Sequence, residues 1–241
     1  EIDVEEPADA ASQAVVYTLD YVTPATAIEV LESAVADFPD DPEFLQKKLE
    51  MESLLNNAEA VAASAHRLAA LLRERKAEPD QIGAAYRRAL ESAEPSPDLL
   101  NEVAEFHLEN NRPGEAASIL RRLVKVRESK GDLDGAIEAL NRIVSFRPSD
   151  EPSLRDLARL NEEVGDYESS REVALRLGGH LISHGQWREA REVYESVVEQ
   201  EGMEEKVLPH LIRITQELGD LEAENLYSAR WTEYLENQGR A

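Results

Sequence analysis

Apolar residues recur every three to four positions along most of the chain, with polar and charged residues between them. Ile137, Leu140, Ile143 and Val144 are one example of this spacing. It places the apolar side chains on one face of an α-helix, so it predicts amphipathic helices and an all-α fold. Together with capping residues it predicts thirteen helices, near 8–21, 24–38, 41–56, 58–76, 79–93, 97–110, 113–130, 132–147, 150–164, 166–184, 187–201, 204–218 and 220–238.

Gly-Asp pairs separate several of the predicted helices, for example at Gly165-Asp166 and Gly219-Asp220. Glycine is favoured just after the end of a helix, and aspartate is favoured as the N-cap of the next one. Such short turns make consecutive helices pack antiparallel. A single hairpin cannot bury its apolar faces alone, so neighbouring helices must cover them in an elongated solenoid.

The chain also repeats itself with a period of about 54 residues, and a fixed period is the sequence signature of a repeat architecture. Residues 116–169 align with 170–223, so that Gly131 falls on Gly185 and Ala136 on Ala190. Weaker copies cover the remaining sequence. We therefore expect an acidic linker followed by one solenoid domain, with the ranges 1–7 for the linker, 8–241 for the solenoid, and 8–61, 62–115, 116–169, 170–223 and a partial 224–241 for its copies.

One segment resembles the tetratricopeptide repeat (TPR) family. In the stretch 131–150 the family pattern of turn glycine, small residue, large apolar residue, apolar residue and proline is matched by Gly131, Ala136, Leu140, Ile143 and Pro148. The resemblance implies antiparallel helical hairpins in a right-handed superhelix with a concave groove that binds another protein. The family's conserved aromatic in its first helix is missing, and the family's own period is shorter, at about 34 residues.

One period of this chain, from Gly131 to Gly185, spans three helices, which is an odd number. In an array that alternates between two layers, equivalent helices of successive copies would then lie in opposite layers. Three-helix units stacked as in armadillo arrays are the alternative. We favour continuous alternation because the three helices are similar in length, and we expect Ile143 and Val197 to face opposite layers.

The charge of the chain limits the classes of partner. It has 50 acidic and 26 basic residues, a formal net charge of −24 and no cysteine. Such a surface repels phosphate backbones and anionic membranes, so we expect no nucleic acid and no membrane insertion. No apolar run approaches the ~20 residues that span a bilayer. The predicted location is cytoplasmic, with a periplasmic one left open.

No residue pattern indicates catalysis, a cofactor or a metal, so the expected protein is not an enzyme. His180 and His184 share one face of a predicted helix, but no third metal ligand lies at a suitable spacing. Gly178 and Gly179 precede them inside the same helix, where glycine is disfavoured. They indicate a close helix crossing or a kink.

Basic residues are the candidates for partner binding, because acidic residues outnumber them. If their helices line the groove, Arg121, Lys125, Arg155 and Arg159 lie where the family contacts peptides. They would bind an acidic segment or a terminal carboxylate. The alternative is pairing with nearby acids, as between Arg159 and Glu163.

Trp231 is the fifth candidate for partner binding. It shares one face of the last predicted helix with Tyr227 and Tyr234. This stripe either docks on the preceding helices or provides a surface for a partner or a further repeat.

The sequence therefore predicts a non-enzymatic protein-interaction scaffold that binds a partner peptide or helix along a concave groove. The alternative is a structural spacer or oligomerisation module of a larger bacterial, envelope-associated assembly, with self-association through the terminal helices. A regulatory domain that senses a small molecule in the groove is a third hypothesis.

Overall fold

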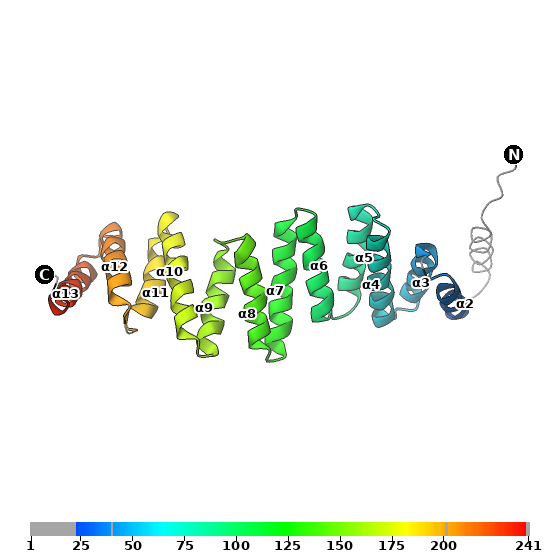
Figure 1. Ribbon diagram of the computed structural model, residues 1–241, viewed down its shortest axis with the longest axis horizontal. Coiled ribbons are helices and arrows are strands. Elements are labelled where there is room, and N and C mark those ends of the chain that lie inside the picture. Colours follow the sequence, from blue (N-terminus) through cyan, green and yellow to red (C-terminus); the bar gives the residue numbers. More distant parts are fainter. Residues whose placement is uncertain (1–22, 40, 201, 240–241) are drawn as a thin grey trace. The chain divides into compact units, whose positions relative to one another are not determined.

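The computed structural model describes residues 23–39, 41–200 and 202–239, and within them the chain is all-α (Figure 1). The predicted linker and the first predicted helix lie outside these residues. The twelve other predicted helices are confirmed. Their bounds are α2 (Pro24–Asp37), α3 (Pro42–Leu54), α4 (Ala58–Glu74), α5 (Pro79–Ser92), α6 (Pro97–Glu109), α7 (Pro113–Ser129), α8 (Leu133–Phe146), α9 (Glu151–Glu163), α10 (Tyr167–Ser183), α11 (Trp187–Val198), α12 (Glu204–Leu218) and α13 (Leu221–Asn237).

The predicted caps explain where the helices begin and end. Gly165 and Gly219 have φ of 84° and 69°, which lie in the left-handed region that favours glycine. The next residue in each case is an N-cap: Asp166 accepts a hydrogen bond from the Ser169 backbone N–H at 3.1 Å. The Gly-Asp pair is therefore the turn that reverses the chain between hairpin helices.

The chain divides into two compact units, the first ending at Val103 and the second beginning at Ala104. Each unit has its own apolar core. The fully buried large side chains include Phe44, Tyr86 and Leu100 in the first unit and Leu120, Leu140 and Tyr194 in the second. The prediction of one solenoid domain over residues 8–241 stays a prediction.

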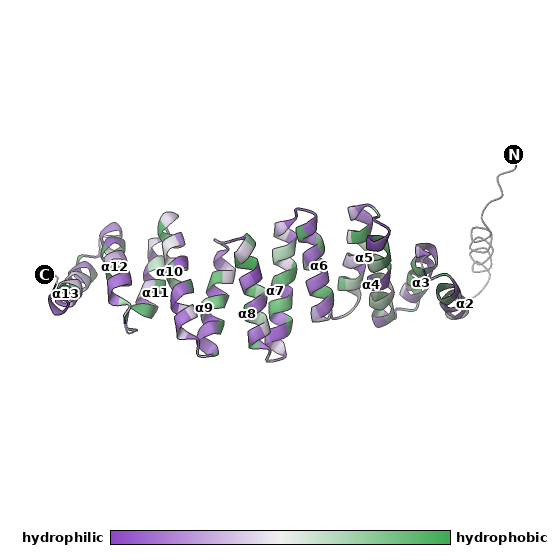
Figure 2. Cartoon of the chain, viewed as in Figure 1, coloured by the Kyte–Doolittle hydropathy of each residue, from purple (hydrophilic) through white to green (hydrophobic). Residues whose placement is uncertain are grey.

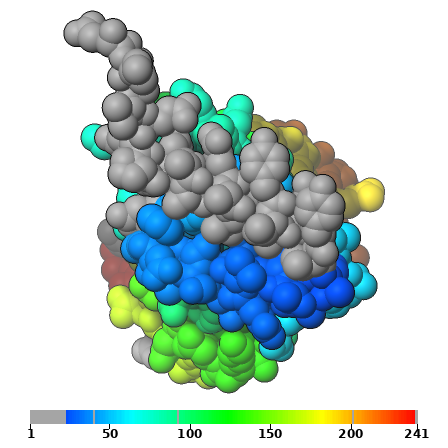
Figure 3. All heavy atoms as spheres, turned by 90° about the vertical axis from the view of Figure 1, so that its right-hand side faces the viewer, coloured from blue at the N-terminus to red at the C-terminus, as the bar shows by residue number. Residues whose placement is uncertain are grey.

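Apolar and polar residues alternate around each helix, so that each helix has an apolar face (Figure 2). The apolar faces of consecutive helices pack against one another within each unit. In Figure 3, which draws all heavy atoms, the atoms of the blue segments α2 and α3 form a continuous surface. No helix among the described residues combines the length and the apolar content needed to cross a membrane.

Ion pairs join helices that are two apart in the sequence. Arg73 of α4 lies 3.7 Å from Glu102 of α6, and Arg142 of α8 pairs with Glu105 of α6. Arg230 of α13 lies 2.6 Å from Glu199, the C-cap of α11. Helices two apart therefore lie close together at these points within each unit. The alternation between two layers, with Ile143 and Val197 facing opposite layers, stays a prediction.

The interior glycine pair of α10 also has a structural reason. A Cβ atom on Gly178 would lie 2.6 Å from Cζ of Tyr194, which belongs to α11. Gly178 is therefore the point at which α11 approaches α10 closely. Gly179 has no heavy atom within 4 Å of an added Cβ, so the close crossing involves only the first glycine.

Candidate protein-interaction surfaces

Arg121 is bound to the N-cap of α9. Its Nη2 atom donates to both carboxylate oxygens of Asp150, at 2.7 and 2.8 Å. Asp150 is buried and also accepts from the Ser153 hydroxyl at 2.6 Å. Burial raises the pKa of Asp150, but the hydrogen bonds from Ser153 and Arg121 outweigh it and hold this pKa below its ordinary value of 3.8. Arg121 therefore joins α7 to the start of α9.

The other predicted arginines are exposed and paired with acids. Arg155 binds Glu151 one turn earlier in α9, at 2.9 Å. Arg159 lies 2.8 Å from Glu128 of α7 and 3.5 Å from Glu163. The pairing of Arg159 with Glu163 is the alternative that the sequence left open. Exposed pairs of this kind contribute only about 0–1 kcal/mol, so a stronger ligand for the guanidinium can replace them.

Lys125 is exposed and makes no ion pair with any residue that the structure describes. It lies on α7 between Arg121 and Glu128, which both bind α9. The structure thus brings Arg121, Lys125, Arg155 and Arg159 onto two neighbouring helices. Residues 110–160 contain ten basic and eight acidic residues, a formal net charge of +2 in a chain of −24.

Trp231 belongs to an aromatic stripe that is partly docked. Its ring is stacked on Tyr234, with the centroids 5.5 Å apart. Tyr227 is buried and donates from its hydroxyl to Glu195 of α11 at 2.5 Å. Burial and this hydrogen bond raise the pKa of Tyr227 to about 12. Tyr227 thus holds α13 against α11, and Tyr234 donates to Glu205 of α12 at 3.2 Å, although Trp231 and Tyr234 remain half-exposed.

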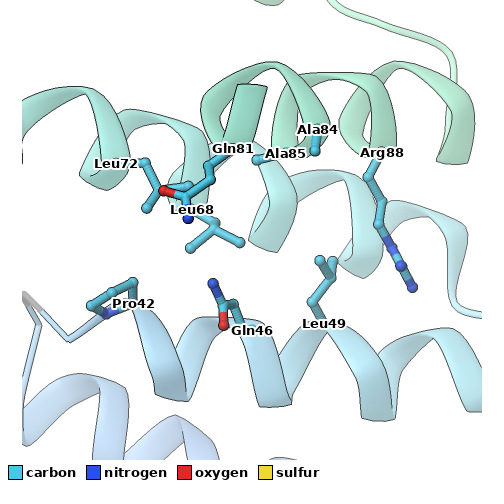
Figure 4. Close-up of a pocket in the computed structure, with 9 residues that line it drawn as sticks. All are labelled: Pro42, Gln46, Leu49, Leu68, Leu72, Gln81, Ala84, Ala85 and Arg88. Carbon is cyan, nitrogen blue, oxygen red and sulfur yellow. The ribbon is translucent and has the colours of Figure 1, made fainter. Parts of the chain in front are cut away.

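The sequence did not predict a hollow in the first unit, which has a volume of about 510 Å³ (Figure 4). Its floor is formed by Leu68 and Leu72 of α4, with Leu49 of α3 beside them. These leucines are only 5–8% exposed as residues, yet they line an open space. The floor is therefore an apolar surface at the bottom of a depression between α3 and α5.

Figure 4 shows side chains of α3 and α5 on opposite sides of this floor. Gln46 stands on the α3 side, and Gln81 and Arg88 stand on the α5 side. Arg88 donates to the Ser53 hydroxyl of α3 at 2.5 Å and also lines a second hollow of about 250 Å³. Ala84 and Ala85 are small, so α5 leaves the floor uncovered where larger side chains would close it.

A cluster of titratable side chains joins α4, α5 and α6. Glu102 accepts from the Tyr86 hydroxyl at 2.6 Å and lies 2.6 Å from Nε2 of His66, with Arg73 at 3.7 Å. Burial raises the pKa of Glu102, but the bonds to Tyr86 and His66 lower it below the ordinary value. Burial and Glu102 raise the pKa of Tyr86. Every member bonds to another member, so the cluster has a structural role in holding three helices together.

The two histidines that share a helix face do not form part of a larger cluster. The rings of His180 and His184 lie 4.2 Å apart, and Nδ1 of His184 is 2.9 Å from the His180 carbonyl oxygen. Within residues 23–39, 41–200 and 202–239, no group of three or more potential ligands is arranged to hold a metal ion.

Comparison with known proteins relates the chain to one repeat family. A family model described as tetratricopeptide repeat matches residues 83–129, from within α5 to the end of α7. This match confirms the resemblance that the sequence shows, and the fold is a helical-repeat array of that kind. A search of curated proteins gives no match.

Solved structures that match the chain in a structure comparison include the pilF protein of Pseudomonas aeruginosa, at 19% identity over 98% of this chain and 100% of that one, with a TM-score of 0.35. BtubC from P. vanneervenii has 14% identity over 98% and 94% of the two chains, with a TM-score of 0.36. A C-terminal part of a TPR-containing protein from Cytophaga hutchinsonii has 10% identity over 90% and 98%, with a TM-score of 0.34. Scores of this size do not establish a common three-dimensional arrangement.

Proposed function

We propose that this chain, a TPR-like helical-repeat protein, is a non-enzymatic scaffold that binds a peptide or helix of a partner protein. The observation that carries the proposal is the hollow between α3 and α5. Leucine side chains of α3 and α4, each 5–8% exposed, form its floor, and α5 places only the small Ala84 and Ala85 beside them. An apolar depression with a few polar groups on its rim is the usual form of a binding site.

The basic residues of α7 and α9 provide a second contact in this proposal. Arg155, Arg159 and Lys125 are exposed on adjacent helices, in the part of the chain that carries a positive formal charge. An acidic segment of the partner would replace the weak surface pairs of the two arginines and bind Lys125 directly. In this proposal Trp231 is a peripheral contact on α13.

A structural spacer or oligomerisation module is the second candidate function. It is favoured by α13, where Leu221 and Leu226 are 71% and 57% exposed. Two leucines on the surface of the last helix suit association with another protein surface. The two functions differ in where a partner would bind: the hollow and the basic residues in the first case, and α13 in the second.

Affinity capture from a lysate of the source cell distinguishes these functions. The bait is the full chain, compared with three variants: Ala84→Phe, which fills the hollow; Arg155→Glu with Arg159→Glu; and Leu221→Glu with Leu226→Glu. Ala63→Phe is the matched control, because Ala63 is an exposed alanine of α4 that does not line the hollow.

We expect a protein that the wild type and Ala63→Phe capture and that Ala84→Phe loses, with weaker capture by the double arginine variant. Loss of capture only in the Leu221/Leu226 variant would support the spacer instead. Identical capture by all variants would contradict both candidate surfaces. Circular dichroism of each variant confirms that it is folded before capture.

A further inference from the structure

We propose that the hollow between α3 and α5 binds an amphipathic helix, with its apolar stripe on the leucine floor and one carboxylate beside Arg88. This inference rests on the proposed scaffold function and specifies the chemistry of the partner. Four observations carry it: the apolar floor, the length of the hollow, the few polar groups on its rim, and the charge distribution around it.

The floor selects aliphatic side chains. Leu49, Leu68 and Leu72 come from two helices and leave no polar side chain at the bottom of the depression. A polar group placed there would lose its water without gaining a hydrogen bond. The part of the partner that faces the floor must therefore be apolar.

The larger hollow and the second hollow, which share Arg88, together match about three turns of helix. On α3 the larger hollow is lined by Pro42, Gln46 and Leu49, and the second by Ser53, and these four residues form a single stripe along that helix. Eleven steps at a rise of 1.5 Å give about 16 Å. A partner helix of this length presents three apolar residues at positions i, i+3 or i+4, and i+7 to the floor.

The rim favours a helix over an extended segment. An extended segment of about five residues would fill 16 Å and would bring about ten backbone polar groups into the hollow. The uncharged polar side chains on the two sides of the larger hollow are Gln46 and Gln81, and the Ser53 hydroxyl is already bonded to Arg88 and to the Leu49 carbonyl, so these groups cannot satisfy that number. A helix satisfies its own backbone groups, so the two amides need only bind polar side chains on its edges.

Arg88 gives the partner helix a direction. It is the charged residue among the nine that line the larger hollow, and it lies beside Ser53 at the end opposite Pro42. A carboxylate at this end of the partner would form a charge-assisted hydrogen bond with the guanidinium. We expect that acid about one turn beyond the last apolar residue of the stripe.

Exposed acids lie beside the lining on both flanking helices. They are Glu43 and Glu50 of α3 and Asp80 and Glu91 of α5, and of these Glu50 is paired with Lys47 at 3.1 Å. Complementary charges guide association and select partners. The flanks of the partner helix therefore carry lysine or arginine, whereas its acid is confined to the Arg88 end.

A synthetic peptide tests this inference. The probe is a fluorescent 16-residue helix former with three leucines at i, i+4 and i+7, lysines on both flanks and one glutamate a turn beyond the last leucine. Anisotropy titrations use the full chain as wild type, Arg88→Glu, Arg87→Glu, Ala84→Phe and Ala63→Phe. Arg87 is the matched control, because it is exposed, adjacent to Arg88 and absent from the lining.

We expect saturable binding to the wild type and a loss of affinity of about tenfold or more in Arg88→Glu, whereas Arg87→Glu changes it by less than about threefold. A second peptide, with lysine in place of the glutamate, should have a higher affinity for the Arg88→Glu variant than for the wild-type chain. Ala84→Phe should abolish binding, and Ala63→Phe should leave it unchanged.

Three results would overturn the inference: no binding to the wild type, equal effects of Arg87→Glu and Arg88→Glu, or full binding to Ala84→Phe. A change in mass by analytical ultracentrifugation in Arg88→Glu would assign the hollow to a second copy of the chain and would also overturn it. The scaffold function survives these results if the lysate capture still depends on the basic residues of α7 and α9.

Discussion

At the scale of single residues, two adjacent glycines of α10 have different roles. An added Cβ on Gly178 would meet Cζ and Cε2 of Tyr194 at 2.6 and 2.8 Å, whereas one on Gly179 meets nothing within 4 Å. Tyr194 is 1% exposed and is stacked on His210 at 5.1 Å, so its ring has no free space to move into. Only Gly178 is required by packing.

We therefore predict opposite effects of two alanine substitutions on the free energy of unfolding. Gly178→Ala should destabilise the chain by about 1–3 kcal/mol through overpacking. Gly179→Ala should stabilise it by about 0.5–1 kcal/mol, because glycine in a helix interior is unfavourable. Urea denaturation of the two variants and the wild type measures both values. Equal stability of the two variants would contradict the close crossing.

Asp150 provides a pH-dependent test at the same scale. Its carboxylate is buried, but hydrogen bonds from Ser153 and Arg121 keep its pKa in the folded chain below 3.8. The stability contributed by this ionisation is therefore present above pH 3.8 and is lost as the pH falls through the folded pKa. Asp150→Asn keeps an N-cap but loses the charge.

We predict that Asp150→Asn is less stable than the wild type at pH 7 by about 1.5–3 kcal/mol, the usual value of a hydrogen bond to a charged group. The difference should shrink as the pH falls below the ordinary pKa of the carboxyl, 3.8. Urea denaturation at pH 7, 5 and 3 measures it. A difference that stays constant over this range would show that the ionisation of Asp150 does not contribute to stability.

At the scale of the helices, the sequence predicted most of the fold because each boundary has its own chemical signal. Proline, aspartate and glycine end or begin helices through local geometry, so Gly165-Asp166 could be recognised without the structure. The partners of the predicted arginines could not be recognised from the sequence. Arg121 binds Asp150 and Arg159 binds Glu128, across 29 and 31 positions. Such pairs depend on which helices are neighbours in space.

These pairs recur in the structure. Arg191 binds Asp220 across 29 positions, as Arg121 binds Asp150, and Arg230 binds Glu199 across 31, as Arg159 binds Glu128. The pairs of Arg121 and Arg159 join α7 to α9. The pairs of Arg191 and Arg230 join α11 to α13, which lie two hairpins further along the chain. These two ion pairs therefore recur after four helices, that is, after two hairpins. The sequence similarity, in contrast, recurs after three helices.

The cluster at α11 and α13 tests this role of the ion pairs. Arg191 binds Glu195 at 2.6 Å and Asp220 at 2.8 Å, and Tyr227 donates to Glu195. We predict that Arg191→Met loosens α13, so that amide hydrogens of residues 221–237 exchange faster while those of α7–α9 do not change. Arg188→Met is the control, because Arg188 is exposed on the same helix. Equal exchange in both variants would contradict the role of Arg191.

At the scale of the whole molecule, the sequence did not predict the hollow between α3 and α5, because the hollow depends on the spacing between these helices. Periodicity predicts that each helix has an apolar face, but it cannot say how closely a neighbouring helix packs on residues such as Leu49, Leu68 and Leu72. That depends on how far apart α3 and α5 lie, and small residues such as Ala84 leave the gap open. The candidate arginines came from their charge and from the position that the family resemblance gives them, and their role in partner binding stays a prediction.

The most direct test of the proposed scaffold function is to map where the captured partner binds on this chain by hydrogen exchange. Amide exchange rates of the chain are measured with and without the partner, and the amides that exchange more slowly in the complex are assigned to helices. We predict protection concentrated in residues 42–54 and 79–92, the helices α3 and α5 that border the hollow. Protection confined to α13, or no protected segment in α3 and α5, would contradict it.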